Sequence, residues 1–356
     1  MRFQPRNEIV MKAAVLTGRR TIEIRDMPSP ECGHGQVIVR PAYVGICGTE
    51  QHVYNGEFEG RVAYPAVLGH EFGGTIVRTG GGVTRFSKGD RVVVDPIIPC
   101  RRCTACHHGH FNACASLKLR GIDLPGGMAE EVVCDEWQLF AYPDTLPMEH
   151  SSMVELYSIG CHCASRCGLE PADTAAVFGT GKVGLSVVDV LRQLGTHTLI
   201  AVDTVDERLA RAETLGADVC INARTKNPVE TIMDITGGEG VDRAVEAVGH
   251  FDEIEDRDPP AAACGRVLRP GGRMVILGQG PRETPFLLKP LVWKEIEIIM
   301  SRVSRGEFPR AVRMMERGKL HPETIITGIY PLEKAGEMFE ILEKNKADHV
   351  KAVLNI

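Results

Sequence analysis

Hydrophobic and polar positions alternate in short runs between Met11 and about Glu155. Gly, Pro and Asp separate these runs, and such residues typically end strands. The pattern predicts strands at 11–16, 21–24, 36–39, 74–77 and 91–94. Because alternation with a period of two indicates a sheet with one face buried, we expect an all-β module in this part of the chain.

The pattern changes between about Pro171 and Glu297, where apolar strands alternate with amphipathic helices. Strands are expected at 175–178 and 199–202, and a helix at 183–194. This alternation predicts a parallel sheet covered by helices. The last part of the chain has helical patterns at 308–317 and 332–344 and a final strand at 351–354.

These patterns indicate two domains, one of them discontinuous. We expect a β-rich catalytic domain over residues 1–157, a nucleotide-binding domain over 158–297, and a return to the catalytic domain over 298–356. A length of 356 residues fits two domains of ordinary size. The ten residues before Met11 are polar and aperiodic, and we interpret them as an extension or a misassigned start.

Composition and charge exclude several classes of function. The chain is 43% hydrophobic and 25% charged, a balance typical of a soluble globular protein. Its net charge of −6, without a run of five or more Lys and Arg residues, argues against binding to nucleic acid or to an anionic membrane. No stretch approaches the roughly 18 apolar residues of a membrane span, and the N-terminus lacks the apolar core of a secretory signal. We therefore expect a cytoplasmic protein.

Four cysteines on one short loop are the strongest chemical signal in the chain. They are Cys100, Cys103, Cys106 and Cys114. Four thiolates satisfy the tetrahedral coordination of structural zinc, whereas disulfides require an oxidising compartment. We expect one structural zinc ion here, with buried or paired thiols as the alternative.

A glycine-rich sequence lies between a predicted strand and a predicted helix in the α/β part. It runs Gly179-Thr180-Gly181-Lys182-Val183-Gly184, so that backbone N–H groups and a helix N-terminus can receive a pyrophosphate. Asp203 ends the next strand, where its carboxylate can accept hydrogen bonds from the adenosine ribose and repel a 2′-phosphate. This favours NAD over NADP, although Arg208 supplies a nearby cation. The alternative is a glycine turn that only allows close packing.

A second set of metal-ligand residues is spread over the β-rich part. Cys47, His70 with Glu71, and Glu155 offer a thiolate, an imidazole and carboxylates. Three protein ligands with one open position are the arrangement of catalytic zinc. Taken singly, the same residues also fit a small core cysteine, a buried histidine and a solvated helix start.

Together these motifs resemble the zinc-dependent medium-chain dehydrogenases, the group of alcohol, sorbitol and threonine dehydrogenases. The resemblance covers the chain from Met11 to Ile356 and implies an α/β protein with a GroES-like β-rich catalytic domain and a Rossmann-type doubly wound parallel sheet. It implies two zinc ions per chain, NAD as cofactor, a small-molecule alcohol substrate, and assembly as a homodimer or homotetramer.

The resemblance also implies roles for single residues. Cys47, His70 and Glu155 correspond to the ligands of catalytic zinc, with Glu71 able to exchange in. Thr49 corresponds to the hydroxyl that contacts the substrate oxygen, and His52 to the residue that passes the proton to solvent.

Two positions depart from the family pattern. Glu50 stands where Asp is usual, so a longer carboxylate must orient the ligand histidine. Leu156 follows Glu155 where many relatives have proline. Both departures concern the geometry of the site and remove no ligand.

The substrate is less well specified by the sequence. Residues 294–309 resemble the branch that oxidises polyols and sugar acids such as hexonates. Within this segment, Arg302 pairs with a substrate carboxylate, holds the cofactor pyrophosphate, or faces solvent. L-Threonine or a simple secondary alcohol is the alternative substrate. The alternative to an enzyme is a non-catalytic or zinc-free homologue that only binds NAD. The set of Cys47, His70 and Glu155 argues against this alternative.

Three further segments are assigned no catalytic residue. We expect buried thiols at Cys161, Cys163 and Cys167, and surface residues at His107, His108 and His110. Residues 251–260 combine acids with paired prolines, which cannot continue a helix. We expect a surface loop there, near the mouth of the cofactor site, that contacts a partner subunit or a bulky substrate.

Overall fold

The computed structural model describes residues 10–58, 60–249, 254, 257–280, 283, 287–345 and 349–356. The chain divides into two compact units. Unit 1 comprises Met1–Glu155 and Ile326–Ile356, and unit 2 comprises Leu156–Ile325. The interpretation of residues 1–10 as an extension falls, apart from Val10, outside the described residues.

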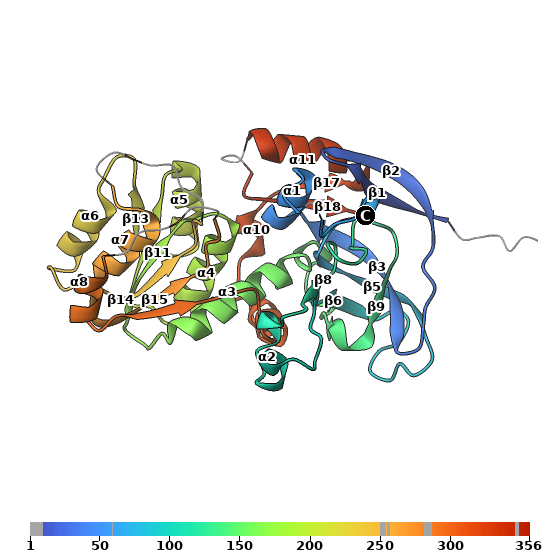
Figure 1. Cartoon of the computed structure of the whole chain (residues 1–356), viewed down its shortest axis with the longest axis horizontal. Helices are drawn as coiled ribbons and strands as arrows, with labels where there is room; N and C mark the ends of the chain where they lie inside the picture. The colour runs from blue at the N-terminus through green and yellow to red at the C-terminus, as the bar shows by residue number, and fades with distance from the viewer. Residues whose placement is uncertain are drawn as a thin grey trace, which may run out of the picture. The chain divides into compact units, whose positions relative to one another are not determined.

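Unit 1 is built on mainly antiparallel sheets, as the alternating pattern predicted (Figure 1). Its largest sheet has the order β10-β6-β5-β3-β18-β17, with β9 also paired to β3, and a smaller one has the order β2-β1-β4. Its strands are β1 Val10–Gly18, β2 Thr21–Pro28, β3 Gln36–Gly45, β4 Ala66–Val67, β5 Glu71–Thr79, β6 Arg91–Val94, β7 Ile97–Ile98, β8 Lys118–Leu119, β9 Val132–Asp135, β10 Leu139–Ala141, β17 Ile326–Pro331 and β18 Lys351–Asn355. Its helices are α1 Gly48–Tyr54, α2 Thr104–His107 and α11 Ala335–Lys344, with short 3-10 turns at Phe111–Ala113, Glu136–Gln138, Met148–His150 and Leu332–Lys334.

The last strand of the chain completes the large sheet of unit 1. β18 pairs antiparallel with β3, where Val353 faces Gly45 and Leu354 faces Val44. The side chains of Val353 and Leu354 are fully buried, so this pairing closes the core around the start of α1. The C-terminal strand therefore lies beside the loop that carries Cys47, as the expected discontinuous domain requires.

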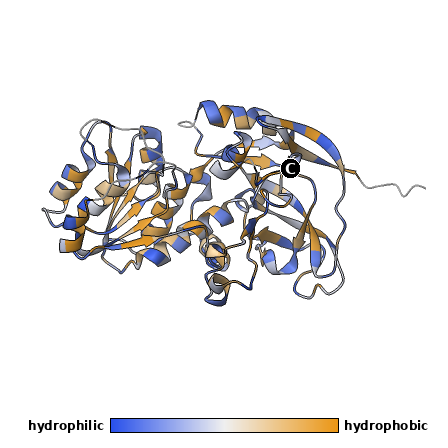
Figure 2. Cartoon of the chain, in the orientation of Figure 1, coloured by the Kyte–Doolittle hydropathy of each residue, from blue (hydrophilic) through white to orange (hydrophobic). Residues whose placement is uncertain are grey.

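Unit 2 is a parallel six-stranded sheet with helices, which confirms the predicted α/β part. The strand order is β13-β12-β11-β14-β15-β16, and Figure 2 shows that its strands are strongly hydrophobic. The strands are β11 Thr174–Phe178, β12 Thr198–Asp203, β13 Val219–Asn222, β14 Val241–Glu246, β15 Leu268–Ile276 and β16 Glu297–Met300. The helices are α3 Met153–Cys167, which begins in unit 1, and α4 Lys182–Gln193, α5 Asp206–Thr214, α6 Pro228–Ile235, α7 Pro260–Val267, α8 Leu288–Trp293, α9 Phe308–Glu316 and α10 Pro322–Ile325.

The strand order reverses its direction at β11. Successive strands run outward from β11 to β13 on one side and from β14 to β16 on the other. Such a reversal opens a crevice outside the carboxyl ends of the central strands, where dinucleotides bind. The glycine-rich sequence begins directly after β11.

The boundary between the units differs from the expected one near residue 297. Residues 298–325 belong to unit 2 rather than to the catalytic domain. β16 supplies the outer strand of the parallel sheet, and α10 packs on α4 and α5. Within unit 2, the guanidinium of Arg211 donates to the carbonyl of Thr324 at 2.6 Å. These contacts depend on the tertiary fold, which the helical pattern of the segment did not reveal.

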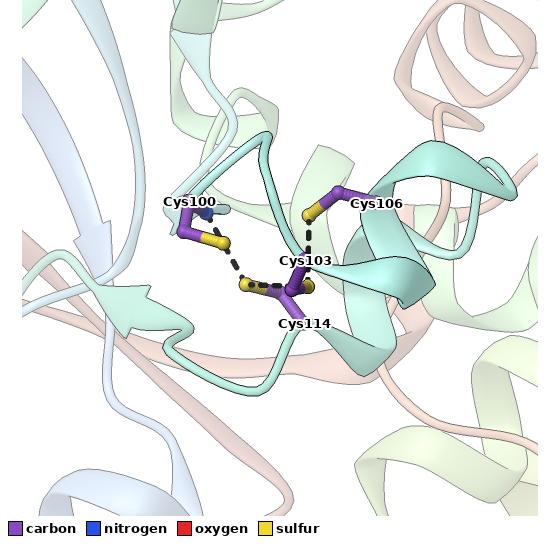
Figure 3. A group of neighbouring side chains, drawn as sticks. All are labelled: Cys100, Cys103, Cys106 and Cys114. Carbon is purple, nitrogen blue, oxygen red and sulfur yellow. Dashed lines mark hydrogen bonds between the residues drawn. The ribbon is translucent and has the colours of Figure 1, made fainter.

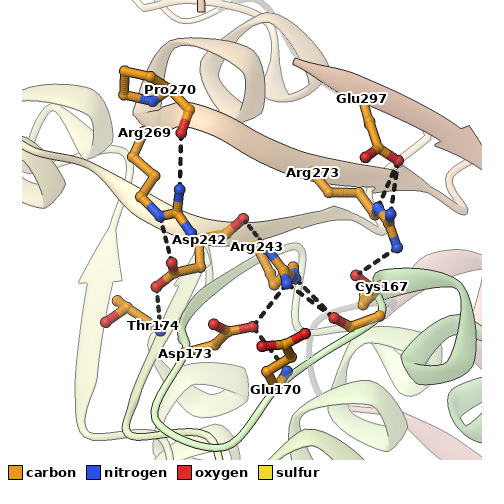
Figure 4. A network of polar contacts seen from close by, with 11 residues as sticks. Cys167, Glu170, Asp173, Thr174, Asp242, Arg243, Arg269, Pro270, Arg273 and Glu297 are labelled. Atoms are coloured by element: carbon orange, nitrogen blue, oxygen red, sulfur yellow. Dashed lines mark hydrogen bonds and ion pairs between the residues drawn. The ribbon is translucent and has the colours of Figure 1, made fainter. Parts of the chain in front are cut away.

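A polar network ties the amino ends of the parallel strands together (Figure 4). Asp242 on β14 accepts from the backbone N–H of Thr174 at 2.8 Å and pairs with Arg269 on β15. Arg273 pairs with Glu297 at the start of β16, at 2.7 Å. Because the glycine-rich sequence lies at the opposite ends of the strands, we interpret this network as structural.

Residues 251–260 are described only in part. Half of the expected loop falls outside the described residues. Pro259 and Pro260 are described: Pro259 caps α7, and Pro260 is its first residue. Proline at the first helical position is favourable because its missing N–H has no partner there in any case. None of the helices in the described ranges is long and apolar enough to span a bilayer.

Candidate metal centres and cofactor site

The four cysteines of the loop form one compact group of sulfur atoms (Figure 3). All four sulfurs lie within 4.8 Å of one another. Cys103 Sγ lies 3.6 Å from Cys106 Sγ and 3.9 Å from Cys114 Sγ. Sulfurs at the corners of a tetrahedron with Zn–S bonds of about 2.3 Å are separated by roughly 3.8 Å, so the group fits zinc.

The backbone around this group favours thiolates. The N–H groups of Cys106 and Ala115 lower the pKa of Cys103 to about 6. The backbone N–H groups of Cys100 and Ser116 point to Cys114 Sγ at 3.2 and 3.4 Å. The neighbouring imidazoles of His107, His108 and His110 are exposed and outside the group, as expected.

The second donor group brings together Cys47, His70 and Glu71. Cys47 caps the start of α1, and His70 and Glu71 stand at the start of β5. One donor atom from each residue lies within 4.8 Å of the other two. His70 and Glu71 are buried, and Cys47 is half-buried. Antiparallel pairing of β3 with β5, in which Gly45 faces Glu71, brings these two distant segments together.

Glu50 holds both halves of this group in place. Its Oε2 accepts from the backbone N–H of Cys47 at 3.1 Å, and its Oε1 contacts both the backbone N–H and the ring Nδ1 of His70. The contact at Nδ1 leaves Nε2 as the ring nitrogen that can bind metal. Burial disfavours charge on the imidazole, but Glu50 and Cys47 raise the pKa of His70 well above its ordinary value. Glutamate at this position therefore reaches the histidine despite its departure from the family pattern.

Glu155 lies close to this group in the first turn of α3. Its side chain is buried, and burial raises the pKa of its carboxyl to about 8, with His70 acting in the opposite direction. Within the described part of the chain, however, the donor atoms that lie within 4.8 Å of those of Cys47 and His70 include one of Glu71 and none of Glu155. Both carboxylates therefore stay candidate ligands, and their order of importance remains a prediction.

Lys351 is a residue of the site that the sequence reasoning missed. It lies on β18 with no exposed surface, and its Nζ donates to Glu71 Oε2 and, at 3.4 Å, to the carbonyl of Ile46. Burial lowers the pKa of Lys351 to about 8, while Cys47 and Glu50 raise it, so the amine is mainly protonated at neutral pH. The only sequence signal was one lysine in an otherwise apolar final strand.

The two residues with expected roles in proton transfer lie on α1. Thr49 Oγ1 is 4.0 Å from Cys47 Sγ. His52, one turn further along the helix, contacts Glu57 Oε2 through Nδ1 at 2.6 Å, and its side chain is 39% exposed. A hydroxyl beside the donor group and an imidazole that reaches solvent are suited to passing a proton outward.

The glycine-rich sequence forms a turn between β11 and α4. Gly179 has φ of +90°, a conformation that favours glycine. A Cβ at Gly184 would lie 1.7 Å from the carbonyl oxygen of Gly179, whereas a Cβ at Gly181 would meet nothing within 4 Å. The third glycine therefore allows the helix to pack, and open space at the second is suited to a pyrophosphate. Lys182 and Val183 form the first turn of α4.

Asp203 accepts four hydrogen bonds, and two of them come from this turn. Its Oδ2 accepts from the backbone N–H and the hydroxyl of Thr180 at 2.6 and 3.0 Å, and its Oδ1 accepts from the N–H groups of Thr204 and Val205. The sequence predicted a ribose-binding role but not this bond to Thr180. The carboxylate thus also fixes the glycine turn. Arg208 is half-buried in the first turn of α5.

The segment after β16 carries the predicted substrate residue. Arg302 is exposed, and Val303 next to it has φ of +43°, which is rare for a β-branched residue. Glu307 fixes the end of this segment because its carboxylate contacts His162 Nδ1 at 2.8 Å and the backbone N–H of Arg305. The backbone near Arg302 is therefore held in a strained conformation by its surroundings.

The cysteines of α3 have no sign of a metal-binding role. Cys161, Cys163 and Cys167 are fully buried, and burial raises the pKa of Cys161 to about 12. They contribute to neither donor group in the described residues. The expectation of buried thiols is confirmed.

Comparison with known families matches both parts of the chain. The family description "Alcohol dehydrogenase GroES-like domain" matches residues 33–144, and "Zinc-binding dehydrogenase" matches residues 183–317. Among curated proteins, the chain is 32% identical over 350 residues to a sorbitol dehydrogenase of Bacillus subtilis, which covers 97% of each chain. It is 29% identical over 341 residues to a 2-dehydro-3-deoxy-L-galactonate 5-dehydrogenase of Pseudoalteromonas atlantica, covering 94% of this chain and 96% of the relative.

Solved structures with the same fold carry either nicotinamide cofactor. The alcohol dehydrogenase RspB of Escherichia coli CFT073, complexed with NADH, aligns with a TM-score of 0.89 and 27% identity over 98% of this chain and 99% of its own. A zinc-binding dehydrogenase of Sinorhizobium meliloti bound to NADP aligns with a TM-score of 0.90 and 28% identity over 98% and 100%.

Proposed function

Because the chain belongs to the zinc-binding medium-chain alcohol dehydrogenase family, we propose that it oxidises a secondary alcohol of a polyol or sugar acid, with NAD as the preferred acceptor. The observation that carries this proposal is the group of Cys47, His70 and Glu71 in unit 1, in which Cys47 is half-buried and the other two residues are buried. Thiolate, imidazole and carboxylate are donors that suit catalytic zinc. A non-catalytic homologue would not need such a group of donor atoms near Thr49 and His52, which are suited to passing a proton outward.

Each residue around the metal has a distinct task in this proposal. Zinc, when bound, supplies a Lewis acid for the substrate oxygen, and NAD supplies the hydride acceptor. Thr49 accepts the proton of the substrate hydroxyl, and His52 passes it to solvent. The contact of His52 Nδ1 with Glu57 Oε2 fixes the orientation of the imidazole. Glu50 orients His70.

The cofactor site is proposed to consist of the glycine turn and Asp203. Open space at Gly181 and the first turn of α4, with Lys182 and Val183, are suited to the pyrophosphate. A carboxylate at the end of β12 gains hydrogen bonds from a free ribose and repels a 2′-phosphate. Arg208 acts in the opposite direction, which limits the preference for NAD.

The substrate class is supported by Arg302 and by two relatives. Arg302 is exposed after β16, and its planar guanidinium suits a carboxylate. The two curated relatives are named for a polyol and for a sugar acid. A polar secondary alcohol with several hydroxyl groups and often a negative charge is consistent with Arg302 and with the two relatives.

A substrate screen tests this proposal. The purified protein is assayed with NAD against polyols, hexonates, L-threonine and simple secondary alcohols, and NADH absorbance is followed. We expect the highest kcat/KM on a polyol or hexonate.

Arg302→Ala should lose about 2–4 kcal/mol of kcat/KM on a hexonate and little on the matching neutral polyol, because only the acid loses a charge-assisted pair. Arg305→Ala, an exposed arginine of the same segment, is the control. Preference for L-threonine would refute the substrate class, and NAD binding without turnover on any alcohol would refute the enzyme.

We also propose that two copies associate through the outer edge of unit 2. β16 is the last strand of its sheet, so one of its edges is unpaired within the described chain. Beside it, Leu288, Val292 and Trp293 of α8 and Met300 of β16 expose large apolar side chains. A strand edge and an apolar surface of this kind are complementary to a second copy related by a twofold axis.

A further inference from the structure

A fully buried ion pair closes one side of the Cys47, His70 and Glu71 group. Lys351 on β18 and Glu71 on β5 both have no exposed surface, and Lys351 Nζ donates to Glu71 Oε2. Taking two charges out of water costs several kcal/mol for each ion, and apolar residues of similar volume often replace such pairs without loss of stability. Stability alone therefore does not account for this pair.

The surroundings of the pair fix both partners. The hydroxyl of Thr327 donates to the carbonyl of Lys351 at 3.0 Å and accepts from its N–H at 3.2 Å, which anchors the strand. Gly45 covers the charged groups, since a Cβ at that position would lie 2.4 Å from Glu71 Oε2 and 2.8 Å from Lys351 Nζ. A side chain at position 45 would therefore displace the pair.

The pair leaves one carboxylate oxygen of Glu71 for a metal. Oε2 is engaged by the ammonium, whereas Oε1 is buried without a hydrogen-bond partner. A donor atom of Glu71 lies within 4.8 Å of those of Cys47 and His70. A carboxylate that already faces a cation at close range shares its negative charge with that cation, so it donates more weakly to a second one.

We propose that Lys351 is a positioning residue of the catalytic metal centre, which holds Glu71 as an exchangeable ligand that reaches the metal through Oε1 alone. The inference rests on the proposed function only in that Cys47 and His70 must bind a metal ion. With Lys351 present, the ammonium and the metal compete for Glu71. Without Lys351, both oxygens and the full charge of Glu71 act on the metal. Replacement of Glu71 at the metal by a substrate or water then becomes unfavourable.

The test replaces Lys351 by methionine in the full-length holoprotein. Co²⁺ is used as the metal probe, and the visible spectrum of the Cys47→Ser protein, which keeps the four-cysteine site, is subtracted. We expect the Lys351→Met spectrum to weaken and shift, as a cobalt centre does when it gains a ligand. We also expect zinc release to a chromophoric chelator to slow about tenfold, which corresponds to about 1.4 kcal/mol of added affinity.

Controls separate this role from a general structural one. Glu71→Gln removes the competing carboxylate, so adding Lys351→Met to it should change neither the cobalt spectrum nor the release rate. The double variant also removes both buried charges together, which protects the fold. Gly45→Ala should displace the pair and act in the same direction as Lys351→Met, whereas Gly18→Ala, where a Cβ meets nothing within 4 Å, should have no effect.

Two outcomes would overturn the inference. One is a Lys351→Met spectrum and release rate equal to those of the unaltered protein, and the other is an equal effect of Lys351→Met with and without Glu71. If Lys351→Met does not fold, Gly45→Ala gives the same two readouts. Failure of the proposed function has a different signature, because the unaltered protein would then lack alcohol turnover, or would bind only the metal of the four cysteines.

Discussion

Single residues in the two metal groups are expected to respond differently to substitution. The four-cysteine group lies within one loop, and we expect bound zinc, rather than the packing of apolar side chains, to hold this loop in its conformation. The group of Cys47, His70 and Glu71 lies on paired strands and a helix that have their own buried core. Loss of a ligand therefore damages the fold in the first case and the chemistry in the second.

Cys103→Ser and Cys47→Ser test this difference. We expect the unaltered protein to carry two zinc ions per chain and each variant to carry about one, as metal analysis can count. Cys103→Ser should lower the unfolding temperature because structural zinc contributes directly to folding. Cys47→Ser should keep the fold and NAD binding and lose alcohol oxidation. Full activity of Cys47→Ser would disprove the catalytic assignment.

Asp203→Ala tests cofactor choice. We expect the unaltered protein to prefer NAD over NADP by about tenfold in kcat/KM, or about 1.4 kcal/mol, and Asp203→Ala to narrow this gap. Because Asp203 also holds Thr180, the variant should bind both cofactors less well. Thr180→Val removes one of these bonds and keeps the carboxylate, so it should weaken both cofactors equally. Equal rates of the unaltered protein with NAD and NADP would show that Arg208 compensates.

At the scale of elements, the amino ends of the parallel strands depend on charged side chains. Asp242 connects β11, through the N–H of Thr174, with β15, through Arg269 (Figure 4). Burial raises the pKa of the Asp242 carboxyl, but the N–H of Thr174 and the guanidinium of Arg269 outweigh it, and the pKa is lowered. A lowered pKa in the folded state means that ionised Asp242 stabilises the fold above its unfolded pKa, and that this contribution is lost as the pH falls through the folded value.

Asp242→Asn tests this contribution. At pH 7 we expect unit 2 to lose about 1 kcal/mol, because a charge-assisted bond is replaced by a neutral one. The difference from the unaltered protein should shrink as the pH falls below about 4, the ordinary pKa of aspartate. Urea unfolding at pH 7 and pH 3.5 measures both. Asp258→Asn, which removes a partly exposed pair with Arg266, should change little at either pH. If Asp242→Asn lowered the free energy of unfolding equally at both pH values, the charge of Asp242 would not be the cause.

At the scale of the whole molecule, the apolar edge of unit 2 is expected to govern assembly. Val292 and Trp293 are 72% and 77% exposed, although both are large apolar residues. Exposed aromatic side chains beside the unpaired edge of a strand are typical of a protein interface.

Trp293→Glu tests this surface. We expect the unaltered protein to be a dimer at micromolar concentration, and the variant to dissociate at least about thirtyfold more readily, since an aromatic anchor contributes about 2 kcal/mol or more. Ile329→Glu places the same charge at an exposed apolar position of unit 1, and the molecular mass of the assembly should stay that of the unaltered protein. Sedimentation equilibrium measures all three proteins. A monomeric unaltered protein would rule out assembly through this edge.

The sequence by itself determined the features that depend on neighbouring residues. The spacing of Cys100, Cys103, Cys106 and Cys114 places four sulfurs on one loop, and the glycine spacing around Gly181 forms a turn between one strand and the next helix. Such local geometry follows from chain connectivity and backbone preferences, so the pattern was sufficient.

The tertiary structure decided the features that depend on strand register. It grouped residues 298–325 with unit 2, placed Glu71 in the donor group beside Cys47 and His70, and paired Glu71 with Lys351, 280 residues away. These contacts exist because β3 lies between β5 and β18. Hydrophobic alternation shows which face of a strand is buried, but it does not specify which strands are neighbours or which residues face each other.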